Sequence, residues 1–160
     1  MIKKIIKIVL LLLCMILIFS FSSDNGSNSS KKSDGLIIRI YQSITHNKLS
    51  DKEKEIIVDK YVITVRKSAH IIVYLILGVL SISLIKEYRL IDIKALIISI
   101  IFCFLYACSD EIHQLFVMDR SGEVLDVLID SIGSFIGIYL YYLIYKKKGV
   151  KRHEQEKATS

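Results

Sequence analysis

Long runs of apolar residues, separated by shorter polar segments, make up most of the chain. The runs cover about residues 5–21, 68–85, 95–116 and 124–145. A helix needs about 20 apolar residues to cross the roughly 30 Å hydrocarbon core of a bilayer, and each run is close to that length. The pattern therefore predicts an all-α protein: an integral membrane four-helix bundle that forms a single domain over residues 1–160.

The polar segment between the first two spans has two different halves. Residues 22–35 (SSDNGSNSSKKSDG) are rich in Ser, Asn and Gly, a composition that predicts a flexible turn segment. Further on, Ser50 is followed three residues later by Glu53, as in a capping box at the start of a helix. Apolar residues then recur at helical spacing up to residue 65, which fits either a helix on the outer membrane surface or an extension of the second span. We therefore expect a partly helical outer loop.

Charge decides the orientation of the spans. The chain is 52% hydrophobic and 24% charged, which excludes a disordered protein and an ordinary soluble domain. Its formal charge of +6 lies mainly at the ends of the apolar runs, as in membrane proteins, and not in a nucleic-acid-binding patch. Basic residues gather in residues 3–7, 86–94 and 146–152. Because cytoplasmic segments of membrane proteins are enriched in Lys and Arg, we expect a multi-pass protein of the cell membrane with both termini cytoplasmic and a basic cytoplasmic tail over 146–160.

The first run has a second interpretation. Ser20-Phe21-Ser22 resembles the small-x-small cleavage site of a signal peptide. The prediction is a retained helix, and cleavage after this motif is the alternative.

Ionisable residues and one glutamine, in or beside three of the spans, form the candidate functional site, because charged groups are expensive to place in a bilayer. They are Arg66, Lys67, His70 and Tyr74 near the start of the second span, Asp110, Glu111, His113 and Gln114 near the end of the third, and Arg120, Asp126 and Asp130 around the start of the fourth. At 1.5 Å per residue, Tyr74, Asp110 and Asp130 each lie about 9 Å inside the expected outer boundary of their span. The polar residues of three helices therefore share one layer, which predicts a common site on the outer side.

Three kinds of chemistry fit these residues. Arg66, Lys67 and Arg120 suit the phosphate of a lipid headgroup. His113 beside Glu111 and Asp110 suits general-base catalysis of a hydrolysis or transfer, with these three as candidate catalytic residues. A salt-bridge cluster that only closes the bundle is the third interpretation. The sequence contains no HExxH motif, Gly-rich phosphate loop or cofactor motif, so we expect no metal and no cofactor.

A pair of glycines on the fourth span predicts close helix packing. Gly133 and Gly137 form a GxxxG motif on the same helical face as Asp126 and Asp130. Such a motif lets two helix backbones approach closely, within one chain or between two chains.

Several of these residues occur in short motifs whose order resembles the VanZ-like family of small bacterial membrane proteins. The motifs are Phe19-Ser20-Phe21-Ser22-Ser23, Arg66-Lys67-Ser68-Ala69-His70 with Tyr74, the run SDEIHQLF over 109–116, Arg120-Ser121-Gly122, and then Asp126, Asp130 and Gly133. The resemblance implies a helical membrane protein of the cell envelope linked to glycopeptide resistance, notably to teicoplanin. It also carries the family's recurring polar positions onto Lys67, His70, Tyr74, Glu111, Gln114, Arg120 and Asp126.

The chain departs from the family pattern in three places. Val73 stands where related sequences often have Glu, Met118-Asp119 replaces a common Pro-Gly, and Asp130 stands where many relatives have Asn. The missing glutamate weakens a metal site, and the missing Pro-Gly changes the turn before Arg120.

We therefore expect a VanZ-like protein whose outer polar pocket engages a membrane lipid or a lipid-linked cell-wall precursor. The expected ligand-binding residues are Lys67, His70, Tyr74, Asp110, Glu111, Gln114, Arg120, Asp126 and Asp130. An intramembrane hydrolase or transferase acting on a lipid-linked substrate is one alternative. A structural or partner-binding membrane protein is the other.

Overall fold

The computed structural model of the chain describes residues 2–24, 26–46, 49–88, 90–118, 120 and 122–158, with the side chains of 26–32 and 148–158 left outside the description. The described residues form five α-helices and one short 3-10 helix. These are α1 (Ile2–Ser22), α2 (Gly26–Thr45), α3 (Asp51–Ile85), η1 (Lys86–Tyr88), α4 (Asp92–Gln114) and α5 (Val124–Ala158). Four of them, α1, α3, α4 and α5, are long and apolar enough to cross a membrane. The predicted all-helical membrane fold is confirmed.

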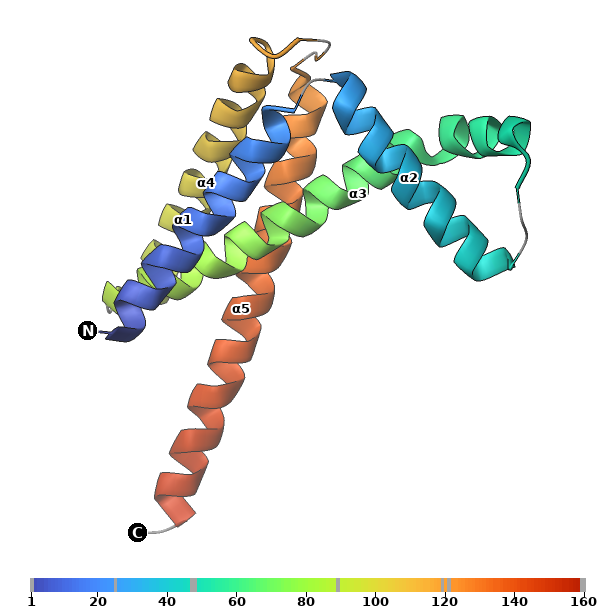
Figure 1. The fold of residues 1–160 in the computed structure, drawn as a ribbon. Coiled ribbons are helices and arrows are strands. Elements are labelled where there is room, and N and C mark those ends of the chain that lie inside the picture. Colours follow the sequence, from blue (N-terminus) through green and yellow to red (C-terminus); the bar gives the residue numbers. More distant parts are fainter. Residues whose placement is uncertain are drawn as a thin grey trace.

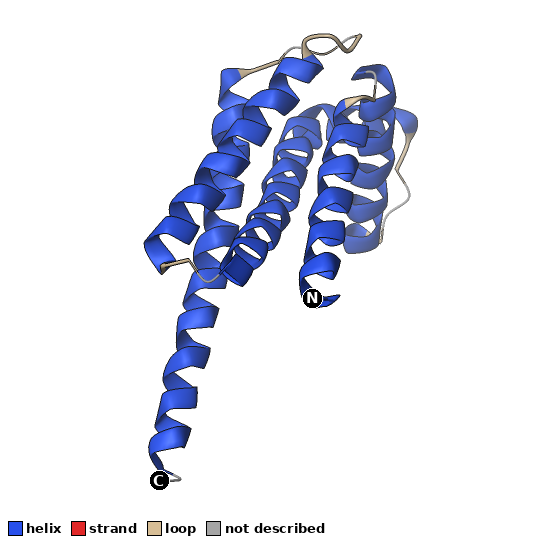
Figure 2. Ribbon diagram, turned by 90° about the vertical axis from the view of Figure 1, so that its left-hand side faces the viewer, coloured by secondary structure: helices blue, strands red, loops and turns tan. Residues whose placement is uncertain are grey.

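Helix α3 is the centre of the assembly. It packs against α1, α2, α4 and α5, and its contact with α5 is the most extensive in the molecule. Figure 1 shows α3 crossing obliquely past the other long helices, with α2 beside its first half. In Figure 2 the last turns of α5 extend well beyond the rest of the bundle.

The segment between the first two spans is more ordered than its composition predicts. Residues 26–45 form helix α2, so the prediction of a flexible turn segment over 22–35 is wrong. Beyond Gly35, apolar residues recur at helical spacing, and Ile37 among them is buried. Because most helical stability in proteins comes from tertiary packing, contact with α3 outweighs the poor helix propensity of the Ser/Asn-rich half.

The start of α3 agrees with the sequence. The predicted capping box is present, and the backbone N–H of Ser50 donates to the Glu53 carboxylate at 2.8 Å. From Asp51 the helix continues without interruption to Ile85. Of the two interpretations of residues 50–65, an extension of the second span is therefore the correct one.

Glycines allow α3 and α5 to touch through their backbones. A Cβ atom added at Gly78 would lie 2.2 Å from the carbonyl oxygen of Ser134, and one at Gly137 would lie 2.1 Å from that of Leu75. At Gly133 the corresponding distance, to the carbonyl oxygen of Ile71, is 2.6 Å. The GxxxG face of α5 thus lies directly on α3 of the same chain, immediately below the carboxylate of Asp130.

At the opposite end of the bundle, lysines of α1 contact the end of α3 and the short helix η1. Lys7 donates to the carbonyl oxygen of Ser83 at 3.0 Å and pairs with Glu87. The ammonium of Lys4 lies 3.6 Å from the centre of the Tyr88 ring. These contacts hold the first turns of α1 against the end of α3, so the basic residues and the polar layer lie at opposite ends.

Candidate functional site

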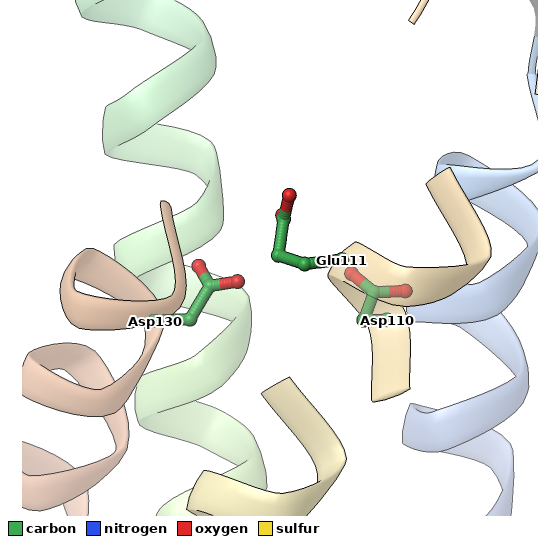
Figure 3. A group of neighbouring side chains, drawn as sticks. All are labelled: Asp110, Glu111 and Asp130. Atoms are coloured by element: carbon green, nitrogen blue, oxygen red, sulfur yellow. The ribbon is translucent and has the colours of Figure 1, made fainter. Parts of the chain in front are cut away.

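Three buried carboxylates from two helices come together near the end of α4. Asp110 and Glu111 lie on α4 and Asp130 lies on α5, and one oxygen from each is within 4.8 Å of the others. Their exposed fractions are only 3%, 5% and 0%. Figure 3 shows the three carboxyl groups facing a common space between α4 and α5. The layer of polar residues that depth arithmetic predicts is therefore a spatial cluster.

The carboxylates of this cluster are hydrogen-bonded to side chains of α3 and α4 and to the backbone just before α5. The Tyr74 hydroxyl on α3 donates to Asp110 at 3.3 Å. Glu111 accepts from the side-chain amide of Gln114 at 2.9 Å and from the backbone N–H of Glu123 at 3.0 Å. Charge-assisted hydrogen bonds of this kind are about twice as strong as neutral ones, so the cluster ties α3, α4 and the start of α5 together.

His70 on α3 binds the third carboxylate. Its Nδ1 lies 3.2 Å from Oδ1 of Asp130, and 27% of its side chain is exposed. One helical turn earlier, Lys67 Nζ lies 3.4 Å from Oδ1 of Asp126, and both of these side chains are partly exposed. The face of α3 that carries Lys67, His70 and Tyr74 thus meets the acidic face of α5 and the end of α4.

Arg120 connects this cluster to the turn after α1. Its Nε donates to the carbonyl oxygen of Asp24 at 3.0 Å, and its Nη2 donates to that of Phe21 at 2.9 Å. Its Nη1 donates to the Gln114 side-chain oxygen at 3.1 Å. Burial and the positive charge of nearby Arg66 lower the pKa of Arg120. A guanidinium placed close to a second one would be stabilised by an anion that contacts both.

A cavity of about 240 Å³ opens beside the cluster. Its apolar wall comes from α1, α2 and α3 and includes Ile18, Phe21, Leu36, Val65 and Val73. Its polar lining is Ser22, Asp24, Ser33, Arg66, His70, Tyr74 and Arg120. Mostly apolar walls with a few converging polar groups are typical of a ligand-binding pocket, here one suited to an amphiphilic molecule.

The structure separates the two candidate histidines. The Nε2 of His113 lies 3.0 Å from the Ser23 hydroxyl, and its ring stacks on Phe19 with centroids 4.4 Å apart. His113 is therefore directed toward α1, while Asp110 and Glu111 enter the carboxylate cluster. The histidine that bonds to a carboxylate of the cluster is His70, and the catalytic assignment of His113 stays a prediction.

Several residues that line the pocket were not among the ligand-binding residues expected from the sequence. Ser33 lies in the segment expected to be a flexible turn and Leu36 directly follows it, whereas Arg66 was considered only with Lys67 and Arg120 as a phosphate ligand. The apolar repeat that follows Gly35 was the available signal for α2. Arg89, Asp119 and Ser121, which also entered the predictions, lie outside the described residues.

The carboxylate cluster is also a set of oxygen ligands. Three carboxyl groups at this separation need a counter-charge, either a proton or a cation, because like charges at short range repel strongly. Carboxylate oxygens are the ligands preferred by Ca²⁺ and Mg²⁺. Asp110, Glu111 and Asp130 are thus the residues that could hold a hard divalent cation, although the sequence motifs predict no metal.

The fold and the cluster define a class: a polytopic helical membrane protein with a buried polar network and a pocket at one end of its bundle. A model of the VanZ/LLP1 family matches residues 7–145, and the chain belongs to this family. The match covers most of α1, all of α3 and α4, and α5 as far as residue 145, so it extends over all four of the long apolar helices. The VanZ-like resemblance is confirmed. A search of curated proteins and a search of solved structures found no match.

Proposed function

We propose that this VanZ-family protein uses its pocket to bind the phosphate-bearing headgroup of an envelope lipid or lipid-linked cell-wall precursor. The observation that carries the proposal is the convergence of Arg66 and Arg120 on one cavity whose remaining wall is largely apolar. Guanidinium groups bind phosphate oxygens through paired, charge-assisted hydrogen bonds. The apolar wall suits the first part of a lipid tail.

The charges around the pocket favour a phosphate over a cationic ligand. Lys67 is paired with Asp126 at the rim, and the buried carboxylates accept hydrogen bonds within the network. Asp24 also lines the cavity and reduces the positive charge there, but two guanidinium groups outnumber it. Binding of a wall precursor in such a pocket would lower the amount that a glycopeptide can reach, which is how we connect the proposal to teicoplanin resistance.

The proposal requires the pocket to lie on the outer side of the cell membrane. Its support is the basic character of the opposite end, where Lys4 and Lys7 pack beside η1 and where the last turns of α5 project. Under the positive-inside rule that end is cytoplasmic, together with both termini.

The first test measures lipid retention. Arg66→Ala removes one guanidinium from the cavity wall, and a hydrogen bond to a charged group contributes about 1.5–3 kcal/mol. We therefore expect the variant to retain roughly 10- to 100-fold less of an anionic probe, farnesyl phosphate, in native mass spectrometry of the purified protein. Arg39→Ala, an exposed arginine on α2, is the matched control and should behave like the parent. Equal retention by Arg66→Ala and the parent would refute the assignment of the pocket.

The second test concerns orientation. Met118 lies in the loop beside the pocket and is 71% exposed, so a cysteine placed there is accessible to reagents. We expect Met118→Cys, in a chain without Cys14, Cys103 and Cys108, to react with a membrane-impermeant maleimide in intact cells. Reaction only after permeabilisation would place the pocket on the cytoplasmic side. An N-terminal tag followed by blotting, lost if α1 is removed as a signal peptide, completes the measurement.

A further inference from the structure

We propose that the pocket is catalytic, with His70 as the general base for hydrolysis of a lipid diphosphate to the lipid monophosphate and inorganic phosphate. The inference rests on the proposed phosphate-binding function and adds a reaction and a substrate class to it. Its basis is a hydrogen-bonded pair in which the aspartate is buried and the partly exposed histidine lines the same cavity as two arginines.

The pair has the geometry of an oriented base. Nδ1 of His70 lies 3.2 Å and 3.5 Å from the two oxygens of Asp130, whose side chain is fully buried. The mechanism assigns the negative charge of the pair to Asp130. Because an ionised carboxylate only accepts hydrogen bonds, this assignment places the imidazole proton on Nδ1 and the lone pair on Nε2. His70 is the partly exposed member of the pair and lines the cavity, which leaves Nε2 as its available base.

Backbone packing fixes this pair. The added Cβ atom at Gly133 would lie 2.6 Å from the carbonyl oxygen of Ile71, the residue that follows His70. The two helices that carry the histidine and the aspartate are therefore in backbone contact within one turn of the pair. Catalytic groups held in this way lose little freedom when substrate binds.

Two arginines supply the charge that a diphosphate requires. Arg66 precedes His70 by four residues, so the two side chains lie one turn apart on the same face of α3. Arg120 reaches the same cavity from the loop before α5. A diphosphate carries two phosphoryl groups, one for each guanidinium, and paired cations stabilise the charge that develops on phosphate oxygens during displacement.

The reaction needs no reagent other than water. A water molecule gives a proton to Nε2 of His70, and its oxygen forms a bond to the terminal phosphorus. The bond between that phosphorus and the bridging oxygen breaks, and its electron pair leaves on the lipid monophosphate. The proton on His70 then passes to bulk water, which restores the base.

The test uses the full chain in phosphatidylcholine vesicles with farnesyl diphosphate as the probe, and it measures both phosphate release and probe binding. The informative variant is His70→Asn, because the Asn amide nitrogen can still donate to Asp130 while the base at Nε2 is removed. General-base catalysis contributes about 10²–10⁴-fold, so we expect phosphate release to fall at least 100-fold with probe binding unchanged within about threefold. His70→Gln provides a second variant if the first does not fold.

Two further variants separate a chemical role from a structural one. Asp130→Asn, which changes a positioning residue, should lower kcat at least tenfold and leave KM within about threefold. His46→Gln, just after the end of α2, is the matched histidine control and should retain parental turnover.

The outcomes distinguish the two proposals. A parent protein that binds the probe and releases no phosphate would overturn the catalytic inference and leave the binding function standing. A parent that does not bind the probe would overturn the proposed function itself. Parental turnover by both His70 variants would exclude His70 as the base.

Discussion

Gly137→Ala is expected to destabilise the bundle severely. The new methyl group would lie 2.1 Å from the carbonyl oxygen of Leu75 and 2.9 Å from its carbon, both of which are backbone atoms of α3. A backbone cannot move aside as a flexible side chain can, so α3 and α5 would have to separate along their whole contact. Overpacking of a well-packed interior already costs about 1–3 kcal/mol, and we expect this variant to lose at least 3 kcal/mol of unfolding free energy.

The measurement is the thermal midpoint of the detergent-solubilised protein, followed by size-exclusion chromatography of a fluorescent fusion. Gly35→Ala on α2 is a matched control, since a Cβ there meets nothing within 4 Å and alanine favours a helix. We also expect Gly133→Ala, with its longer 2.6 Å approach, to be less severe than Gly137→Ala. A parental midpoint for Gly137→Ala would show that the two helices are not in backbone contact.

Arg120→Ala is expected to produce the second largest loss of stability. The change removes the Arg120 donors to the backbone carbonyls of Phe21 and Asp24 and to the Gln114 side chain. The bonds to Asp24 and Gln114 are partly buried, whereas the bond to Phe21 is exposed and its carbonyl still accepts from the Asp24 N–H. A buried acceptor left unsatisfied costs about 1–3 kcal/mol, so we expect the two partly buried acceptors to give a total loss of about 2–4 kcal/mol. The end of α1 should also become more accessible to proteases.

Arg120→Lys distinguishes charge from geometry at this position. Lysine keeps the positive charge but cannot place three donors in the planar fork of arginine. We therefore expect Arg120→Lys to recover only a small part of the lost stability in the same thermal assay, while Arg39→Ala changes it little. Full recovery by lysine would mean that charge alone, and not the three hydrogen bonds, holds the turn after α1.

The sequence predicted the parts of the molecule that depend on distance along a helix. Because a helix rises 1.5 Å per residue, equal depths for Tyr74, Asp110 and Asp130 follow from their positions in the chain alone. The Tyr74–Asp110 hydrogen bond and the placing of Asp110 beside Asp130 agree with that arithmetic. The structure also contains the close helix approach that Gly133 and Gly137 predict. The GxxxG motif alone, however, does not say which helix will be the partner.

The rotation of a helix about its axis was harder to predict. Asp110 and His113 are only three residues apart and were considered together as candidate catalytic residues, yet the two positions differ by about 60° around the helix. The structure turns α4 so that Asp110, Glu111 and Gln114 are buried while His113 contacts α1. Only the packing of neighbouring helices decides that rotation, and it brings His70, and not His113, into contact with a carboxylate of the cluster.

The prediction of a flexible segment in place of the first half of α2 was wrong for a related reason. The Ser/Asn-rich half of this helix has little intrinsic tendency to be helical, and its contact with α3 is a tertiary interaction that short sequence patterns do not encode. Since α2 supplies part of the cavity wall, the shape of the pocket could not be predicted, although most of its polar residues could.

The central place of α3 has a consequence for how the chain is made. Two of its partners, α4 and α5, are synthesised after it, and α5 contributes its most extensive contact. When α3 first enters the bilayer, His70 has no Asp130 and Gly78 faces lipid instead of another backbone. Helices associate in the membrane only once both have inserted, so the His70–Asp130 pair and the backbone contact of α3 with α5 form only after α5 has been synthesised. A chain that ends before α5 leaves the polar face of α3 without this partner.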